Sequence, residues 1–161
     1  MPKIAIIILN WNQSQLTIST IESFIKIKHT NFEYQIILVT NQKLKIENCK
    51  LKIVKYSSNL GYSGGNNLGI KYALKNNFDY ILIANNDIRV APDFLEKLFI
   101  EIEKDSKLIL APKIYFEKGY EFYKNKYQKS DLGNVIWAMG GKIDWSNVYG
   151  SNIAIDEVDK G

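Results

Sequence analysis

Three short clusters are rich in asparagine, glycine and aspartate, and their side chains are the candidates for binding a ligand or a metal ion. The clusters are residues 10–12 (Asn-Trp-Asn), 59–67 and 85–87 (Asn-Asn-Asp). Asp87 offers a carboxylate beside the amide oxygens of Asn85 and Asn86. Mg²⁺ and Mn²⁺ prefer such oxygen ligands and are often shared between a carboxylate and substrate phosphates. The competing interpretation is a simple turn, which Asn and Asp also favour.

The second cluster holds Gly61, Gly64 and Gly65, and glycine lets a backbone approach a ligand closely. A helix that starts near residue 63 would offer free N–H groups to an anion. The competing interpretation is a tight strand-to-helix connection. The cluster lacks the Lys and Ser/Thr of a P-loop, which argues against an NTPase. The first cluster has no Gly-x-Gly-x-x-Gly pattern, which argues against a dinucleotide-binding domain.

The first cluster supplies candidates for contact with a nucleoside, Asn10 by hydrogen bonds and Trp11 by stacking. A structural interpretation is equally open and is compatible with the first. In it, Asn12 caps the next helix, with Gln15 three residues later as a loose capping box, and Trp11 anchors that helix.

Alternating apolar strands and amphipathic helices over residues 1–112 must position these clusters. The expected strands are residues 3–9, 34–39, 51–56, 80–84 and 108–110, with helices after residue 12, up to residue 76, and around residues 95–102. This order predicts an α/β fold with a mostly parallel sheet and helices on both faces. Ligands of such sheets bind beyond the carboxyl ends of the strands. All three clusters fall on that edge, which is the main evidence for a binding site.

The sequence changes character after Pro112. Residues 115–130 are expected to form a loop or ragged hairpin, and residues 135–143 a strand with a kink at Gly140 and Gly141. Residues 144–161 show no clear element. The length predicts a single domain over residues 1–161, with an alternating core (1–112) and an irregular hairpin and partial acceptor side (113–161).

Composition excludes several classes of protein. The net charge is +4, but the Lys residues are scattered and Arg89 is the only arginine, so a nucleic-acid partner is not expected. No apolar run spans a bilayer, and no signal peptide is recognisable. Cys49 is the single cysteine, which argues against a disulfide framework. These features predict a cytoplasmic protein, with weak peripheral attraction to the anionic inner face of a membrane left open.

Several segments together resemble a known family. They are "IIILNWNQ", "NLGYSGGNNLGIKYAL", "YILIANNDIRVAPDFLEKL", "APKIYF" and "IWAMGGKID". In this order they resemble the family-two glycosyltransferases, nearest to the rhamnosyltransferase-like enzymes of cell-surface polysaccharide assembly. The resemblance implies a GT-A fold, an NDP-sugar donor, a divalent cation and inversion at the anomeric carbon.

The resemblance also assigns roles to residues. Asn85, Asn86 and Asp87 occupy the place of the family's Asp-x-Asp motif, with Asp87 as the metal ligand. Other residues fall where the family contacts the nucleotide or shapes its pocket; these are Asn10, Gly61, Asn66 and Asn67. The implied reaction transfers a hexosyl or deoxyhexosyl group to a glycan or lipid-linked acceptor.

Two departures from the family pattern matter. Thr40 occupies the position of an Asp that reads the nucleobase, so the base contact is altered. The chain is also expected to stop before the acceptor-side segment with the catalytic base, which leaves the base unknown. The alternative to a complete transferase is therefore a truncated or split member that binds nucleotide or a partner chain without turnover. A second chain, including a second copy of this one, is one way to complete the site.

Overall fold

The computed structural model describes residues 1–46, 50–105, 107–123 and 125–161. Cys49 lies outside them. The chain divides into two compact units, Met1–Ile100 and Glu101–Gly161. The boundary between the units, after Ile100, lies before Pro112, where the alternating strand and helix pattern of the sequence ends. The expectation of one domain stays a prediction. No described helix combines the length and apolar character needed to span a membrane.

A four-stranded parallel sheet forms the centre of the first unit. Its strands are β1 (Lys3–Asn10), β2 (Glu33–Thr40), β3 (Leu51–Lys55) and β4 (Tyr80–Ala84), in the order β3-β2-β1-β4. These four strands confirm the predicted ones to within one residue at each end. The two inner strands, β1 and β2, are apolar runs buried on both faces, as in other parallel sheets, whereas Ile81 and Ile83 of β4 are exposed. The parallel register aligns Asn10 with Thr40, so both strands end together.

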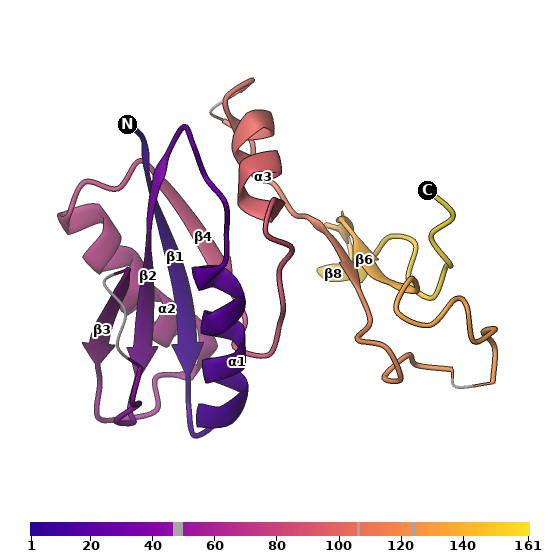
Figure 1. Ribbon diagram of the computed structural model, residues 1–161, viewed down its shortest axis with the longest axis horizontal. Coiled ribbons are helices and arrows are strands. Elements are labelled where there is room, and N and C mark those ends of the chain that lie inside the picture. The colour runs from indigo at the N-terminus through magenta and orange to yellow at the C-terminus, as the bar shows by residue number, and fades with distance from the viewer. Residues whose placement is uncertain (47–49, 106, 124) are drawn as a thin grey trace. The chain divides into compact units, whose positions relative to one another are not determined.

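Two helices cover opposite faces of the sheet, α1 (Ser14–Ile25) and α2 (Gly61–Lys75) (Figure 1). The third helix, α3 (Phe94–Ile102), packs beside α1, where the rings of Phe24 and Phe94 meet edge to face at 6.3 Å. The predicted arrangement, with helices on both faces, is confirmed.

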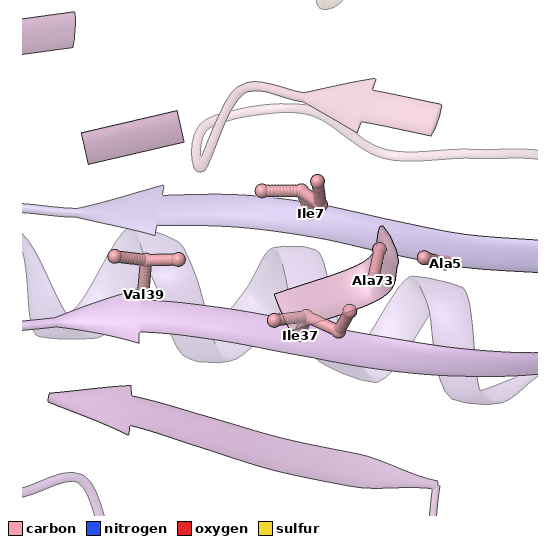
Figure 2. Close-up of a cluster of buried hydrophobic side chains, with 5 residues drawn as sticks. All are labelled: Ala5, Ile7, Ile37, Val39 and Ala73. Carbon is pink, nitrogen blue, oxygen red and sulfur yellow. The ribbon is translucent and has the colours of Figure 1, made fainter. Parts of the chain in front are cut away.

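The core under α2 contains Ala5 and Ile7 from β1, Ile37 and Val39 from β2, and Ala73 from the helix (Figure 2). All five are fully buried. Leu74, the next residue, is exposed, because the buried face of α2 passes through Ala73.

Both helix starts differ from the prediction. Asn12 does not cap α1, because it adopts a left-handed φ of 59°. Gln13 occupies the cap position, and its N–H donates to Asn10 Oδ1 at 3.2 Å. α2 begins at Gly61, so Gly64 and Gly65 lie inside the helix rather than in a turn before it.

The second unit consists of two small antiparallel sheets. β5 (Lys113–Tyr115) pairs with β6 (Ile136–Met139), and β7 (Gly141–Asp144) pairs with β8 (Tyr149–Asn152). Gly140 separates β6 from β7 with a φ of +80°, which confirms the predicted kink. The prediction of a strand at residues 108–110 was wrong, since Ile109 is 99% exposed and has no core to join. The prediction of no element after residue 144 was also wrong, because β8 forms there.

Candidate functional site

Asn10 is the centre of a buried polar network at the carboxyl end of β1. Its side chain is fully buried. Asn10 Nδ2 donates to Thr40 Oγ1 at 2.9 Å, and Asn10 Oδ1 accepts from the Thr17 hydroxyl at 2.9 Å. Together with the bond from the Gln13 N–H, these contacts tie the ends of β1 and β2 to the start of α1. The predicted residue is therefore present at the edge, but as a structural hub without exposed surface.

Thr40 has no exposed surface either. Its hydroxyl oxygen accepts from Asn10 Nδ2 and from the Gln42 N–H at 3.0 Å. Gln42 Oε1 in turn accepts from Ser14 Oγ at 2.6 Å and from Asn10 Nδ2 at 3.3 Å. In this arrangement Thr40 orients Asn10 and the chain after β2, and does not itself present a hydroxyl to a ligand.

The Asn85-Asn86-Asp87 cluster is joined to the same network through Asn86. Its Nδ2 donates to Thr17 Oγ1 at 3.0 Å and to Gln13 Oε1 at 3.3 Å. The Thr17 hydroxyl therefore contacts Asn10 at the end of β1 and Asn86 beyond the end of β4. The first and third clusters converge, as the sheet topology predicted.

Asn85 connects the third cluster to the second. The Tyr62 hydroxyl, on the first turn of α2, donates to Asn85 Oδ1 at 3.2 Å. Both side chains are exposed, with Tyr62 at 60%. The three clusters therefore share one edge of the first unit, and polar side chains connect them.

An aromatic pair lies at this edge. The rings of Trp11 and Tyr56 are 5.7 Å apart and inclined at 34°. Tyr56 follows β3, and its hydroxyl donates to the Asn10 carbonyl at 3.3 Å. Burial raises the pKa of the Tyr56 phenol, so it stays a protonated donor at neutral pH. Trp11 remains partly exposed, which leaves its ring available for stacking.

The glycine-rich cluster serves packing as well as access. A Cβ at Gly65 would lie 2.5 Å from Leu9 Cδ1, and one at Gly69 would lie 2.6 Å from Ile7 Cγ2. These glycines let α2 lie close against β1. Gly61 differs, because it has a left-handed φ of +67° and open space around it, and its N–H donates to Asn59 Oδ1 at 2.9 Å. Gly61 is therefore required for its left-handed conformation at the helix start, not for close packing.

The two asparagines of α2 differ in exposure. Asn67 is exposed and Asn66 is 3% exposed. Asn66 Nδ2 donates to the Tyr62 carbonyl at 3.0 Å, whereas its Oδ1 is buried and has no partner among the described residues.

Asp87 is exposed and makes no hydrogen bond or ion pair with any residue that the structure describes. The described part of the chain holds no group of three or more His, Cys, Asp or Glu that could enclose a metal. One free carboxylate beside amide oxygens fits Mg²⁺ or Mn²⁺ only where substrate phosphates complete the coordination, which is how Mg²⁺ is usually bound. The donor set thus fits a metal that arrives with a diphosphate.

Two carboxylates of the second unit, Asp159 and Asp144, are engaged by neighbours within it. Asp159 accepts from Lys113 Nζ at 2.7 Å and from the Tyr115 hydroxyl, and these bonds lower its pKa to about 2. Asp144 accepts from the side chain and N–H of Asn147, which lowers its pKa. Carboxylates held in this way are ionised but are poor proton acceptors at neutral pH.

Sequence reasoning missed several residues that build the site: Gln13, Thr17, Gln42, Tyr56 and Tyr62. Thr17 carried a weak signal, since it is a polar residue on the face of the helix that also carries Ile21 and Phe24. The others carried none that we recognised.

A family model matches most of the chain. The family model described as "Glycosyl transferase family 2" matches residues 5–155. Among curated proteins, the chain is similar to the low-salt glycan biosynthesis hexosyltransferase Agl10 of Haloferax volcanii, with 34% identity over 62 residues. That alignment covers 38% of this chain and 20% of the relative.

Two solved structures are similar in fold. Both are S. aureus TarS 1-349, one in complex with UDP-GlcNAc (TM-score 0.51) and one with UDP (TM-score 0.50), each at 14% identity. The first covers 77% of this chain and 41% of that one, and the second 78% and 43%. The chain thus spans about a fifth of the curated relative and about two fifths of the solved chains. The likeness shows a GT-A-like fold: a parallel four-stranded sheet with helices.

Proposed function

The chain belongs to glycosyl transferase family 2, and we propose that its first unit is the donor half of a sugar-transfer site. The observation that carries this proposal is the convergence of the three polar clusters through the Thr17 hydroxyl and the Tyr62–Asn85 hydrogen bond. Open α/β sheets bind ligands at this edge. An NDP-sugar is the ligand class that a family-two transferase requires, and TarS in complex with UDP-GlcNAc supports that class.

The donor site divides into parts by chemistry. Trp11 and Tyr56 form an aromatic surface that suits a nucleobase, since aromatic side chains stack on bases. Asn85 and Asp87 offer exposed oxygen ligands to Mg²⁺ or Mn²⁺. When bound, the cation neutralises charge on the diphosphate as it leaves. Asn10 and Thr40 do not contact the donor in this proposal; their hydrogen bonds hold the ends of β1 and β2 in place.

The proposed reaction is a direct displacement with inversion. An acceptor hydroxyl attacks the anomeric carbon, the bond from that carbon to the diphosphate breaks, and the hydroxyl proton passes to a base. The acceptor is a glycan or lipid-linked glycan in cell-surface polysaccharide synthesis, at the cytoplasmic face of a membrane. The group transferred is proposed to be hexosyl or deoxyhexosyl, and the similarity to a hexosyltransferase supports this.

A second candidate function is binding without turnover, and the engaged carboxylates of the second unit favour it. Asp144 and Asp159 are bound to neighbours and have lowered pKa values. Asp156 accepts from the Tyr127 hydroxyl at 3.2 Å. This chain alone then has no turnover, and sugar transfer requires a base supplied by another chain, such as a second copy of this one.

Calorimetric titration tests the donor site. Wild type and Asp87→Ala are titrated with UDP, dTDP, GDP and ADP, with and without Mn²⁺. We expect Mn²⁺-dependent binding of at least one nucleotide, lost in Asp87→Ala. The control is Asp93→Ala, which removes only an exposed pair with Lys97 and should bind as wild type does. Failure of wild type to bind any of the four would sink the proposal.

A further inference from the structure

Residues 116–135 connect β5 to β6 in the second unit, and the described ones form turns but no helix or strand. Connections longer than about 12–15 residues without such elements are uncommon, and the ordered ones usually carry a function. This connection is tied to its own unit. The Phe116 N–H donates to the Val135 carbonyl at 2.9 Å, and the Tyr127 hydroxyl donates to Asp156 Oδ1 at 3.2 Å. Its exposed side chains are therefore presented from a fixed backbone.

The connection buries its charge and exposes its rings, which reverses the usual distribution. Glu121 is 4% exposed, and its carboxylate accepts from the Gly133 N–H at 2.7 Å and the Gly119 N–H at 2.8 Å. Burial opposes ionisation of Glu121, but backbone N–H groups outweigh it and lower the pKa of the carboxyl. The neighbouring rings of Tyr120 and Phe122 are 77% and 71% exposed. A cluster of exposed apolar side chains, unlike an isolated one, marks a surface that binds a partner.

Exposed lysines lie among these rings: Lys118, Lys126 and Lys129. Lys126 Nζ is 5.3 Å from the ring centroid of Tyr123 and 5.7 Å from that of Tyr127. Lys124 lies outside the described residues. The sequence between residues 118 and 129 holds one acid, Glu121. Every exposed charge on the described part of this segment, which we call the aromatic-basic loop (residues 118–129), is therefore positive.

Two further acids flank the aromatic-basic loop, Glu117 and Asp131. Asp131 Oδ2 accepts from the Gln128 N–H at 2.9 Å, so this carboxylate is bound to the backbone. The chain as a whole carries a net charge of +4. The loop therefore suits an anionic partner that also offers an apolar environment to the rings.

An anionic phospholipid surface has both properties. Tyrosine rings favour the boundary between acyl chains and head groups, and lysines extend their ammonium groups towards the head groups. Each lysine near an anionic leaflet is attracted to it. A depression of about 680 Å³, lined by Phe122, Tyr123, Asn125 and Lys126, places rings and an ammonium group side by side on this surface.

Other macromolecular partners fit this surface less well. A stable protein interface engages about 20–30 residues on each side, more than residues 118–129 provide. Single-stranded nucleic acids also bind rings and cations, but surfaces that recognise phosphate favour arginine. The only arginine of this chain, Arg89, lies in the first unit.

We propose that the aromatic-basic loop docks this chain on an anionic phospholipid surface. The rings of Tyr120 and Phe122 enter the interface between acyl chains and head groups, and the three exposed lysines contact lipid phosphates. This inference goes beyond the donor site, because docking requires neither nucleotide nor metal.

The test is co-sedimentation of the full chain with phosphatidylcholine vesicles, prepared with and without about 30% phosphatidylglycerol as the anionic lipid. Wild type should bind the anionic vesicles at least tenfold more tightly than the neutral ones. Raising NaCl from about 0.05 M to about 0.5 M should weaken the binding, because salt screens charges.

Three variants separate the contributions. The charge variant carries Lys118→Gln, Lys126→Gln and Lys129→Gln, and should bind anionic vesicles about a hundredfold more weakly, about fivefold for each lysine. The ring variant carries Tyr120→Ser and Phe122→Ser, and should bind about tenfold more weakly or worse. The matched control removes three exposed lysines of the first unit, by Lys43→Gln, Lys45→Gln and Lys71→Gln, and should bind nearly as wild type does.

Melting temperatures monitor folding of the variants. All the replaced side chains are exposed, so each variant should melt within a few degrees of wild type. The Phe122 ring centroid lies 4.8 Å from that of Tyr123. If losing this contact lowers the melting temperature, Tyr120→Ser alone replaces the ring variant, and it should still weaken vesicle binding severalfold.

Four results would overturn the inference: wild type without preference for anionic vesicles, a charge or ring variant that binds as wild type does, a control weakened as much as the charge variant, and tighter binding of a single-stranded oligonucleotide than of anionic vesicles. A wild-type dimer in sedimentation that the ring variant loses would assign the loop to self-association instead. None of these results bears on the donor site, and a failed nucleotide titration leaves lipid docking in place.

Discussion

Replacing Thr17 with valine tests whether one hydroxyl joins the site together. Valine keeps the branched shape and volume, so no cavity forms and helix propensity changes little. The substitution removes the bond from Asn86 Nδ2 and the bond that the hydroxyl itself donates, which Asn10 Oδ1 and the Gln13 carbonyl both accept at 2.9 Å. Asn10 Oδ1 keeps only the Gln13 N–H, at 3.2 Å, and Asn86 keeps only Gln13 Oε1, at 3.3 Å.

The magnitude follows from those two lost bonds. At about 1 kcal/mol each they sum to about 2 kcal/mol, and the added buried methyl group recovers part of that. We expect Thr17→Val to lower the free energy of unfolding by about 1–2 kcal/mol, measured by urea denaturation followed by circular dichroism. Nucleotide binding with Mn²⁺ should weaken further than stability alone requires, because Asn86 is no longer held beside Asp87.

Thr17→Ser is the matched control, since it keeps the hydroxyl and loses the methyl. It should restore Mn²⁺-dependent nucleotide binding. The reasoning is refuted if Thr17→Val is as stable as wild type, or if Thr17→Ser binds nucleotide no better than Thr17→Val.

Two further predictions concern packing and pH. Gly69→Ala should destabilise the first unit by about 1 kcal/mol in urea, since overpacking against Ile7 Cγ2 costs about 2 kcal/mol and the gain in helix propensity returns about 1. Gly65→Ala should be close to neutral, because its closest contacts are the two terminal methyl groups of Leu9, which can turn aside. Equal effects of the two substitutions would contradict this expectation. Hydrogen bonds from Lys113 and Tyr115 lower the pKa of Asp159 from 3.8 to about 2, so its stabilising contribution is present above pH 4 and lost as the pH falls towards 2. Acid unfolding monitored by near-ultraviolet circular dichroism should begin at higher pH in Asp159→Asn, and an unchanged acid transition would show that Asp159 does not hold the second unit.

Sequence patterns were sufficient for the elements that are buried. β1 and β2 are apolar runs with a core on both faces, and β3 and β4 are shorter and partly buried; all four were predicted to within one residue at each end. β8, with the sequence Tyr-Gly-Ser-Asn, is exposed throughout and shows no apolar alternation, so it left no signal. The apolar residues 108–110 gave a false one, because Ile109 and Leu108 are exposed.

The candidate site was predictable in position but not in its internal contacts. Parallel strands bring their carboxyl ends to one edge, so Asn10, Asn85 and Asp87 could be placed there from order alone. The bonds that join them link residues far apart in sequence, such as Asn86 and Thr17, and no local pattern encodes a pair of that kind. The sequence also did not indicate that Asn10 and Thr40 are fully buried. Because they are buried, they support the edge of the sheet instead of offering side-chain contacts to a ligand.

The most direct test of the central claim is an NMR measurement on the isotopically labelled chain with Mn²⁺ and the nucleotide that binds best. Manganese broadens signals from nuclei near it, so the positions of broadened amides map the metal–diphosphate site. The account predicts broadening first at residues 85–87, then at residues 10–12 and 61–66, and none of it in Asp87→Ala. Broadening centred within residues 101–161, or unchanged by Asp87→Ala, would contradict the placement of the donor site at the carboxyl ends of β1, β2 and β4.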